Sequence, residues 1–565
     1  MKDDKSFYKN LIIATILSTL LITMWNGLTK NPEENQETKI IEQEENQIIL
    51  QPEITEETQT TKQKEIVPIN SKPKIEQQAD SIKINTRKLQ GEISLRGLTF
   101  NKLILQTYYQ DLKKIEKIVL LDEQENGNSY IVDFGWISQD KNIETPTSNT
   151  IWNSKNKELT ATTPAILDWT NNQGLKFQII LSIDENYMFN IQQSVTNSTG
   201  KSVVLIPYGR ISKTIKELEK AIFILHEGAI GVFDNQLEEI TYKNLAKKDY
   251  KFENNTNWFG ITDKYWLTAI IPDKNHSFIT KFSYKNNKYK TEFIGKNITI
   301  YNDQTINLNN YFFAGAKELN ILDKYSKDLN IPLFDRAVDF GWYYFLTKPI
   351  YILLKLFYNL IGNFGVAILI LTLIVKILTY PLSKKSFVSM AKMKTVQPKV
   401  SALKKEYPND KSKLNKEIMK LYQKEKVNPM SGCLPMFIQI PIFFSLYKVL
   451  YVTLDMRHAP FFAFIKDLSA PDPTNILNLF GLLSFETSAS FHIGLLPILM
   501  SVTIYLQQKL NTQVTDNETA KAMTKYMPII FLFLFINFPA GLLIYWIFSN
   551  IITIVQQFLI NKKIK

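Results

Sequence analysis

The sequence predicts a polytopic helical membrane protein that carries a large β-rich soluble domain. Two observations indicate this fold class: apolar residues crowd the first thirty positions and the region after about residue 340, and short β-branched runs fill much of the stretch between them. With 565 residues, 45% of them hydrophobic and 21% charged, the chain is too long for one domain and too apolar for a disordered one. Cys433 is the single cysteine and the four histidines lack metal-ligand spacing, so we expect no disulfide, metal or cofactor.

Residues 1–29 are predicted to be a short cytoplasmic end followed by an uncleaved transmembrane anchor. Leu11–Thr29 is uncharged over nineteen residues, about the length that crosses a hydrocarbon core at about 1.5 Å per residue. A cleaved secretory signal is the alternative, but no small-x-small cleavage site follows the run. Because Lys2, Lys5 and Lys9 precede it, the positive-inside rule places the N-terminus in the cytoplasm.

Residues 30–85 are predicted to be a flexible linker outside the cytoplasm, since Glu, Gln, Thr, Lys and Asn dominate and cannot bury a core. Residues 86–330 are predicted to form an extracytoplasmic β-sandwich, because runs such as KFQIILSIDENYMFNIQQSVTN alternate between Asn, Asp and Gly turns. A helical piece, Gly315–Leu329, closes this domain. No nucleophile and base have catalytic spacing here, so we expect a spacer or docking surface and not an enzyme.

Residues 331–362 are predicted to form an amphipathic interfacial helix that lies on the outer face of the membrane. Aromatic residues at positions 342–345 lie close to Lys348 and Lys355, and such clusters favour the boundary between water and lipid. A spanning helix is the alternative, and Pro349 counts against it.

Residues 363–565 are predicted to be a helical core with five spans. Their segments are Phe364–Leu382, the uncharged run between Lys426 and Lys448 with its extension to Leu454, His492–Leu506, Tyr526–Phe538, and the run from about 541 to Ile560. The last two divide at Phe538-Pro539-Ala540-Gly541, because thirty-five uncharged residues would make one helix of about 52 Å. With the anchor, six spans leave both termini in the cytoplasm. Tyr526–Phe538, at about 20 Å, is shorter than the roughly 30 Å hydrocarbon core, so we expect a thinned bilayer beside it.

Lysines support this topology. Residues 383–426 hold thirteen lysines against four acids, whereas residues 454–491 hold only Arg457 and Lys466 as bases. The basic segment is therefore predicted to be cytoplasmic. Apolar residues recur in it at steps of three and four on both sides of a Pro408-Asn409-Asp410 turn, which predicts a helical hairpin over residues 384–426. The hairpin either packs on itself or offers a methionine-bearing surface to clients.

Lys376 is the most informative residue of the core. A lysine in mid-span costs about 2.5–3.5 kcal/mol on insertion scales, so it should face protein or a wet cavity. Thr372 and Tyr380 share its helix face, and no acidic residue in any span neutralises it. Polar residues on other spans are candidates to meet it: Gln439, Ser501, Gln507, Asn537, Tyr545, Ser549, Thr553 and Gln556. Each alone is compatible with simple interhelical hydrogen bonding, but together with Lys376 they predict a polar hollow with one positive charge.

Other classes of membrane protein fit less well. A transporter is expected to show paired ionisable residues and repeated halves, a channel needs a ring of charges or a closed oligomer, and a protease needs a catalytic dyad. None of these patterns occurs in the spans. A small-solute transporter and a structural partner of a translocon remain the alternatives to a groove that receives polar or negative groups.

The core resembles the YidC/Oxa/Alb family of bacterial membrane protein insertases. The resemblance rests on the runs GNFGVAILILTLIVKILTYPLSKK, VNPMSGCLPMFIQIPIFFSLYKVLY, RHAPFFAFIKDLSAPDP and NFPAGLLIYWIFSNIITIVQQFLI. It covers residues 335–565 densely, and the region before them resembles the Gram-negative type with a large periplasmic domain. The resemblance implies five core helices around a hydrophilic groove, a β-supersandwich periplasmic domain, and an inner-membrane insertase and folding chaperone that acts alone or with the Sec translocon.

The resemblance also implies functional residues and partners. Lys376 falls at the position of the charged groove residue, which is most often arginine in the family. The positive charge is therefore kept, but the planar guanidinium that can bind a carboxylate in a bidentate manner is lost. The expected client-binding groove comprises Lys376, Thr372, Gln439, Tyr545, Trp546 and Ser549. Implied partners are nascent membrane proteins, the Sec translocon, the lipid bilayer, and the ribosome and signal recognition pathway through the hairpin. Because only five residues follow Ile560, ribosome recruitment would either fall to the hairpin or be weak. Nucleic acid is not an expected substrate. An insertion-like stretch at residues 479–494 has no assigned role.

Overall fold

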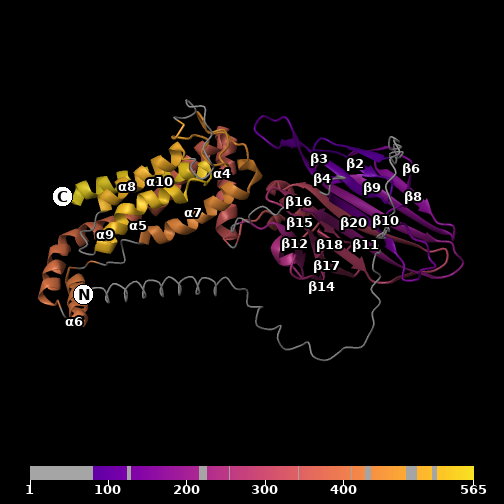
Figure 1. The fold of residues 1–565 in the computed structure, drawn as a ribbon, viewed down its shortest axis with the longest axis horizontal. Coiled ribbons are helices and arrows are strands. Elements are labelled where there is room, and N and C mark those ends of the chain that lie inside the picture. The colour runs from indigo at the N-terminus through magenta and orange to yellow at the C-terminus, as the bar shows by residue number, and fades with distance from the viewer. Residues whose placement is uncertain are drawn as a thin grey trace, which may run out of the picture. The chain divides into compact units, whose positions relative to one another are not determined.

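The structure, a computed structural model, describes residues 81–564 apart from residues 124–128, 216–224, 254, 342, 409, 426, 428–433, 479–492 and 512–517. The predicted anchor, nearly all of the predicted linker and most of the 479–494 stretch lie outside the described residues. The described chain consists of a strand-rich part, drawn in indigo to magenta in Figure 1, followed by a helical part in orange to yellow.

Two large sheets build the strand-rich part, and every pairing is antiparallel except that of β1 with β7. In spatial order the first sheet contains β14 (Tyr250–Phe252), β17 (Phe278–Lys285), β18 (Lys288–Gly295), β11 (Val203–Thr214), β5 (Ser129–Ile137), β4 (Lys117–Glu123), β3 (Thr99–Tyr109), β2 (Leu89–Ser94), β1 (Ser81–Asn85) and β7 (Glu158–Leu159), with β19 (Ile298–Ile300) paired to β11. The second contains β13 (Gln236–Thr241), β12 (Gly228–Phe233), β15 (Thr256–Thr262), β16 (Trp266–Ile271), β20 (Thr305–Ala316), β10 (Met188–Asn197), β9 (Leu175–Ile183), β8 (Ala165–Thr170) and β6 (Asn153–Ser154).

The sheets pack face to face as a sandwich. Strand β9 buries every second side chain, because successive side chains of a strand point to opposite faces. Aromatic rings bridge the layers: the Phe100 and Phe189 ring centroids are 5.3 Å apart, and those of Phe134 and Phe312 are 6.2 Å apart. The prediction of a large β-rich domain is confirmed.

The N-terminal edge of this domain differs from the prediction. Residues 81–85 fall within the predicted linker but form β1, which pairs along its whole length with β2. Ile82 and Ile84 are buried in the sandwich, and two apolar residues in a lysine- and asparagine-containing pentapeptide are too weak a pattern to indicate a strand. The linker prediction was therefore wrong for these five residues.

The described part of the chain also contains eleven helical segments. The short ones are α2 (Tyr242–Leu245), α3 (Leu319–Asp328), and the 3-10 turns η2 (Phe334–Ala337) and η4 (Leu454–Met456). The long ones are α4 (Tyr344–Ile361), α5 (Phe364–Glu406), α6 (Lys411–Lys424), α7 (Leu434–Val452), α8 (Leu495–Asn511), α9 (Glu518–Leu534) and α10 (Ala540–Ile564). Helix α10 packs against α5 and α8, and α7 packs against α4 and α5.

Helix α5 joins two elements that the sequence suggested were separate. It begins at an Asn363 side chain that accepts the Val366 N–H at 3.1 Å, and it continues for 43 residues through the predicted span and the first arm of the hairpin. Helix α6 then returns, so that Val396 and Val400 pack beside Ile418 and Leu421. The apolar residues of the hairpin thus pack on each other, and client docking there stays a prediction.

Helix α4 also differs in one respect from the sequence interpretation. Pro349 is the sixth of its 18 residues and does not end it, although a proline at that position removes one i→i−4 hydrogen bond. The helix ends at Gly362, whose φ of +79° is the left-handed conformation that glycine adopts easily.

By length and composition, two described helices, α5 and α10, can cross a membrane. Shorter apolar stretches lie at Ile438–Val452 in α7 and at Lys525–Leu534 in α9. Helix α9 spans 17 residues and ends at Leu534, before Pro539, which keeps it below the twenty residues of an ordinary crossing. These observations establish a helical region with candidate membrane helices. The count of six spans with a five-helix core stays a prediction.

Candidate functional site

Polar side chains of α5, α7 and α10 meet at Lys376. The Lys376 Nζ donates to the Gln439 Oε1 at 3.3 Å and to the Thr553 Oγ1 at 3.0 Å. These residues are separated by 63 and 177 positions in the chain, so packing of α10 on α5, and of α7 on both, brings them together. We call Lys376, Gln439, Thr553 and Tyr545 the polar chain.

Tyr545 completes the polar chain from α10. Its hydroxyl accepts a short hydrogen bond from the Gln439 Nε2, so the Gln439 amide accepts from Lys376 and donates to Tyr545 at the same time. The Tyr545 side chain is buried. The amide is therefore held in one orientation by partners on two other helices.

The charge of Lys376 has no acidic partner among the residues that the structure describes, since no carboxylate there forms an ion pair with it. Its two hydrogen-bond acceptors, an amide and a hydroxyl, are neutral. Lys376 is only partly buried, and the next two residues, Ile377 and Leu378, are exposed at 61% and 74%. A positive charge thus lies beside an apolar surface that faces outward from the helices.

Three of the predicted site residues take other roles. The Thr372 hydroxyl is buried and donates to the Ile368 carbonyl of its own helix at 2.7 Å. The Ser549 carbonyl accepts the Thr553 hydroxyl at 2.7 Å. Trp546 packs against aromatic rings, with its centroid 4.6 Å from that of Phe443. The structure thus joins Lys376, Gln439 and Tyr545 directly, while Thr372, Ser549 and Trp546 line neighbouring positions.

Thr553 is a member of the polar chain that was among the polar candidates on the last span but was not included in the expected client-binding groove. It follows Tyr545 by eight residues and Ser549 by four, so all three lie on one face of α10. That spacing was the available signal, but it could not show whether the hydroxyl of Ser549 or that of Thr553 reaches Lys376.

A buried ion pair on α7 had no sequence signal. The Lys448 Nζ lies 2.8 Å from the Asp339 Oδ2, which also accepts the His226 backbone N–H at 2.9 Å. The Gly341 N–H donates to the Asp339 Oδ1 at 3.0 Å. Burial acts to raise the pKa of Asp339, but Lys448, the His226 hydrogen bond and the charge of Lys317 outweigh it and hold the pKa below its usual range. The pair joins α7 to the segment before α4.

Two family models together cover the described chain. Residues 81–353 match the model described as YidC periplasmic domain, and residues 356–565 match the 60Kd inner membrane protein. A membrane protein insertase YidC of Rickettsia bellii is 44% identical over 563 residues, covering 98% of both chains. That of Rickettsia prowazekii is 43% identical over 562 residues, covering 98% of this chain and 99% of the relative. A crystal structure of an active YidC insertase aligns over 86% of this chain and 92% of its own, at 18% identity and a TM-score of 0.35.

Proposed function

Since this chain belongs to the YidC family of membrane protein insertases, we propose that the polar chain is where it receives the polar flank of a client. Members of this family insert membrane proteins into the lipid bilayer and are not enzymes. One observation carries the proposal: a lysine with neutral hydrogen-bond partners and no described acid to pair with it, beside an outward apolar surface.

The proposed mechanism is physical. A polar group that enters hydrocarbon without hydrogen bonds costs several kcal/mol. Hydroxyl, amide and ammonium groups within the membrane core offer replacement partners, so the path through pure hydrocarbon becomes shorter. The apolar part of the client then moves over exposed residues such as Ile377 and Leu378 into lipid. The charge of Lys376 attracts acidic flanks, and Gln439 and Thr553 keep it oriented.

The finer topology belongs to the same proposal. We propose six crossings, five of them forming the core, with both termini in the cytoplasm of an inner membrane and the β-sandwich in the periplasm. The lysine asymmetry between residues 383–426 and 454–491 supports this orientation. We also propose that the chain inserts clients alone or with the Sec translocon, and that the α5–α6 hairpin receives ribosomes and the signal recognition pathway through its lysines.

Charge variants of Lys376 test the site. In liposomes that contain only the purified full chain, Lys376→Arg should insert clients with acidic flanks at the parental rate. Lys376→Glu should slow them by about tenfold or more, equivalent to about 1.4 kcal/mol in the barrier, and Lys376→Ala should fall between. Clients with neutral flanks should change little. Lys384→Glu is the matched control, because it makes the same charge change at an exposed position two turns along α5.

The competing explanation is that Lys376 only holds helices together. It predicts that the Ala and Glu variants lose thermal stability and insertion in parallel, for acidic and neutral clients alike. Folded Lys376→Glu protein that inserts acidic-flanked clients at the parental rate would remove the proposed role of the charge.

A further inference from the structure

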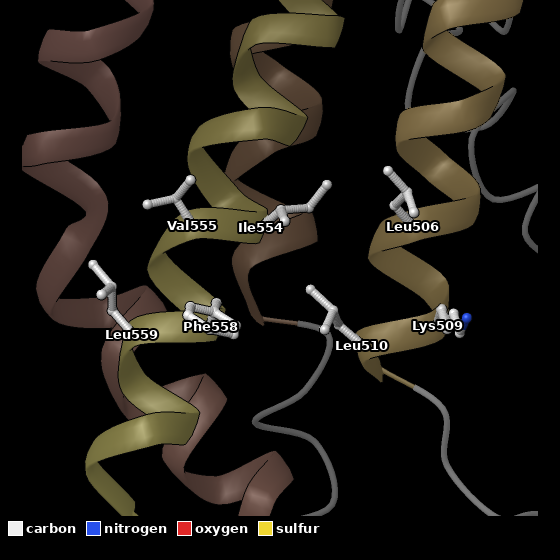
Figure 2. Close-up of a pocket in the computed structure, with 7 residues that line it drawn as sticks. All are labelled: Leu506, Lys509, Leu510, Ile554, Val555, Phe558 and Leu559. Carbon is white, nitrogen blue, oxygen red and sulfur yellow. The ribbon is translucent and has the colours of Figure 1, made fainter.

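An apolar hollow separates the ends of α8 and α10. Its volume is about 520 Å³. Figure 2 shows that the lining comes from both helices: Leu506, Lys509, Leu510, Ile554, Val555, Phe558 and Leu559. Six of these seven residues are apolar. Thr553 of the polar chain bonds to Lys376 on α5, whereas its neighbour Ile554 lines this hollow, so α10 contributes to two different sites.

Lysines from three helices lie around one end of the hollow. Lys509 belongs to the lining and points its nitrogen away from the apolar side chains (Figure 2). Lys562 and Lys563 are exposed, and each lies four residues after a lining residue of α10 and so on the same helix face. From α5, the Lys394 Nζ donates to the Leu510 carbonyl at 3.0 Å. Among the described residues that line the hollow there is no carboxylate.

We propose that this hollow binds an anionic phospholipid, with an acyl chain against the apolar lining and the phosphate among Lys509, Lys562 and Lys563. Basic clusters at the membrane end of a cleft between helices recognise anionic headgroups, because the ammonium groups reach the headgroup level while their stems cover apolar surface. A small soluble anion gains nothing from six apolar side chains. A client's polar flank would find none of the hydroxyl or amide groups that the polar chain offers.

Such a lipid acts as a filler between α8 and α10. In a protein interior an empty apolar space costs packing energy, and within a bilayer an acyl chain is the available apolar group of the right shape. The occupied site therefore stabilises the contact of α10 with α8, and it does so whether or not Lys376 attracts clients.

Lipid retention by the full chain tests the site. The protein is purified from vesicles of phosphatidylcholine with rising fractions of phosphatidylglycerol, and retained lipid is measured by native mass spectrometry. The parental chain should retain phosphatidylglycerol in preference, and the preference should weaken at high salt. Lys509→Gln, Lys562→Gln and Lys563→Gln should each reduce it by roughly fivefold, the size expected for one lysine near an anionic surface. A control with Lys392→Gln, Lys405→Gln and Lys416→Gln removes three exposed hairpin lysines and should leave it unchanged.

A second measurement does not depend on the variants folding. Phosphatidylglycerol with a photoreactive group at the end of one acyl chain should label the parental protein at 506–510 and 554–559. Labelling spread evenly over the apolar helix surfaces would overturn the proposal. Equal retention of phosphatidylcholine, equal loss in the control variant, or displacement of the label by a client segment would each overturn it as well.

Discussion

Breaking the Asp339–Lys448 pair by Lys448→Met should destabilise the protein strongly. The two side chains are only 12% and 15% exposed, so Asp339 would stay buried with two backbone N–H donors and without its ion-pair partner, and Lys317 would be the cation that still acts on it. Removing one partner of a buried pair typically costs about 3–5 kcal/mol, because the remaining charge is uncompensated. Lys324→Met on α3 is the matched control, since that lysine is exposed and surface substitutions usually stay within about 0.5 kcal/mol.

The pH dependence gives this prediction a second readout. In the parental protein the pKa of Asp339 is held below its usual range, so the pair's contribution is complete above the unfolded value of about 3.9 and is lost as pH falls through the folded value. In Lys448→Met, burial acts without the ion-pair partner, so the pKa of Asp339 rises above its parental value even though Lys317 still lowers it. The deficit of the variant should therefore be largest near pH 7 and shrink toward pH 4, as Asp339 takes up a proton.

Thermal unfolding of the purified full chain at several pH values measures both effects. Adding Asp339→Asn to Lys448→Met should recover much of the loss, because neither charge then stays buried alone. The reasoning is refuted if Lys448→Met unfolds at the same temperature as the Lys324→Met control, or if its deficit is the same at pH 7 and near pH 4.

Two further predictions concern the bilayer and the β-sandwich. The apolar stretch Lys525–Leu534 of α9 has ten residues, which is about 15 Å of helix against roughly 30 Å of hydrocarbon. Electron cryo-microscopy in nanodiscs should therefore show a thinner membrane beside α9, and a membrane of uniform thickness contradicts this prediction. Deleting 81–330, with the bounds moved to keep strands whole, should leave client insertion largely intact because the polar chain and the Asp339–Lys448 pair remain. The deletion protein should be less stable, since Arg457 loses the Tyr109 carbonyl that it contacts at 2.6 Å; loss of insertion by a folded, membrane-located deletion protein counts against this division.

Periodicity made much of the fold predictable. The alternation of β9 and the apolar runs of α5 and α10 are local patterns, and each follows from which side chains must be buried. Element ends were harder, as β1 shows: only Ile82 and Ile84 mark it, and their burial depends on pairing with β2.

The site was predictable in kind but not in every member. Lys376 stands out because a charge is rare in a span, and Gln439 and Tyr545 are polar residues on other spans. Which hydroxyl of α10 meets the lysine depends on the rotation of α10 about its axis, and this is set by packing on α5 and α8. Trp546, one residue and about a hundred degrees from Tyr545, consequently faces aromatic rings. The Asp339–Lys448 pair joins residues 109 positions apart, for which no local pattern exists.

Energy magnitudes favour a functional reason for the charge of Lys376 over a purely structural one. Hydrogen bonds between membrane helices contribute about 0.6 kcal/mol on average, so the two that Lys376 makes, at 3.0 and 3.3 Å, supply roughly 1 kcal/mol. A lysine at mid-span costs about 2.5–3.5 kcal/mol to insert. A neutral residue such as glutamine could bond to Gln439 and Thr553 at lower cost, and the hydrogen bonds alone therefore do not account for an ammonium group. The proposed attraction of acidic client flanks would supply a reason, because it uses the one property that a neutral residue lacks.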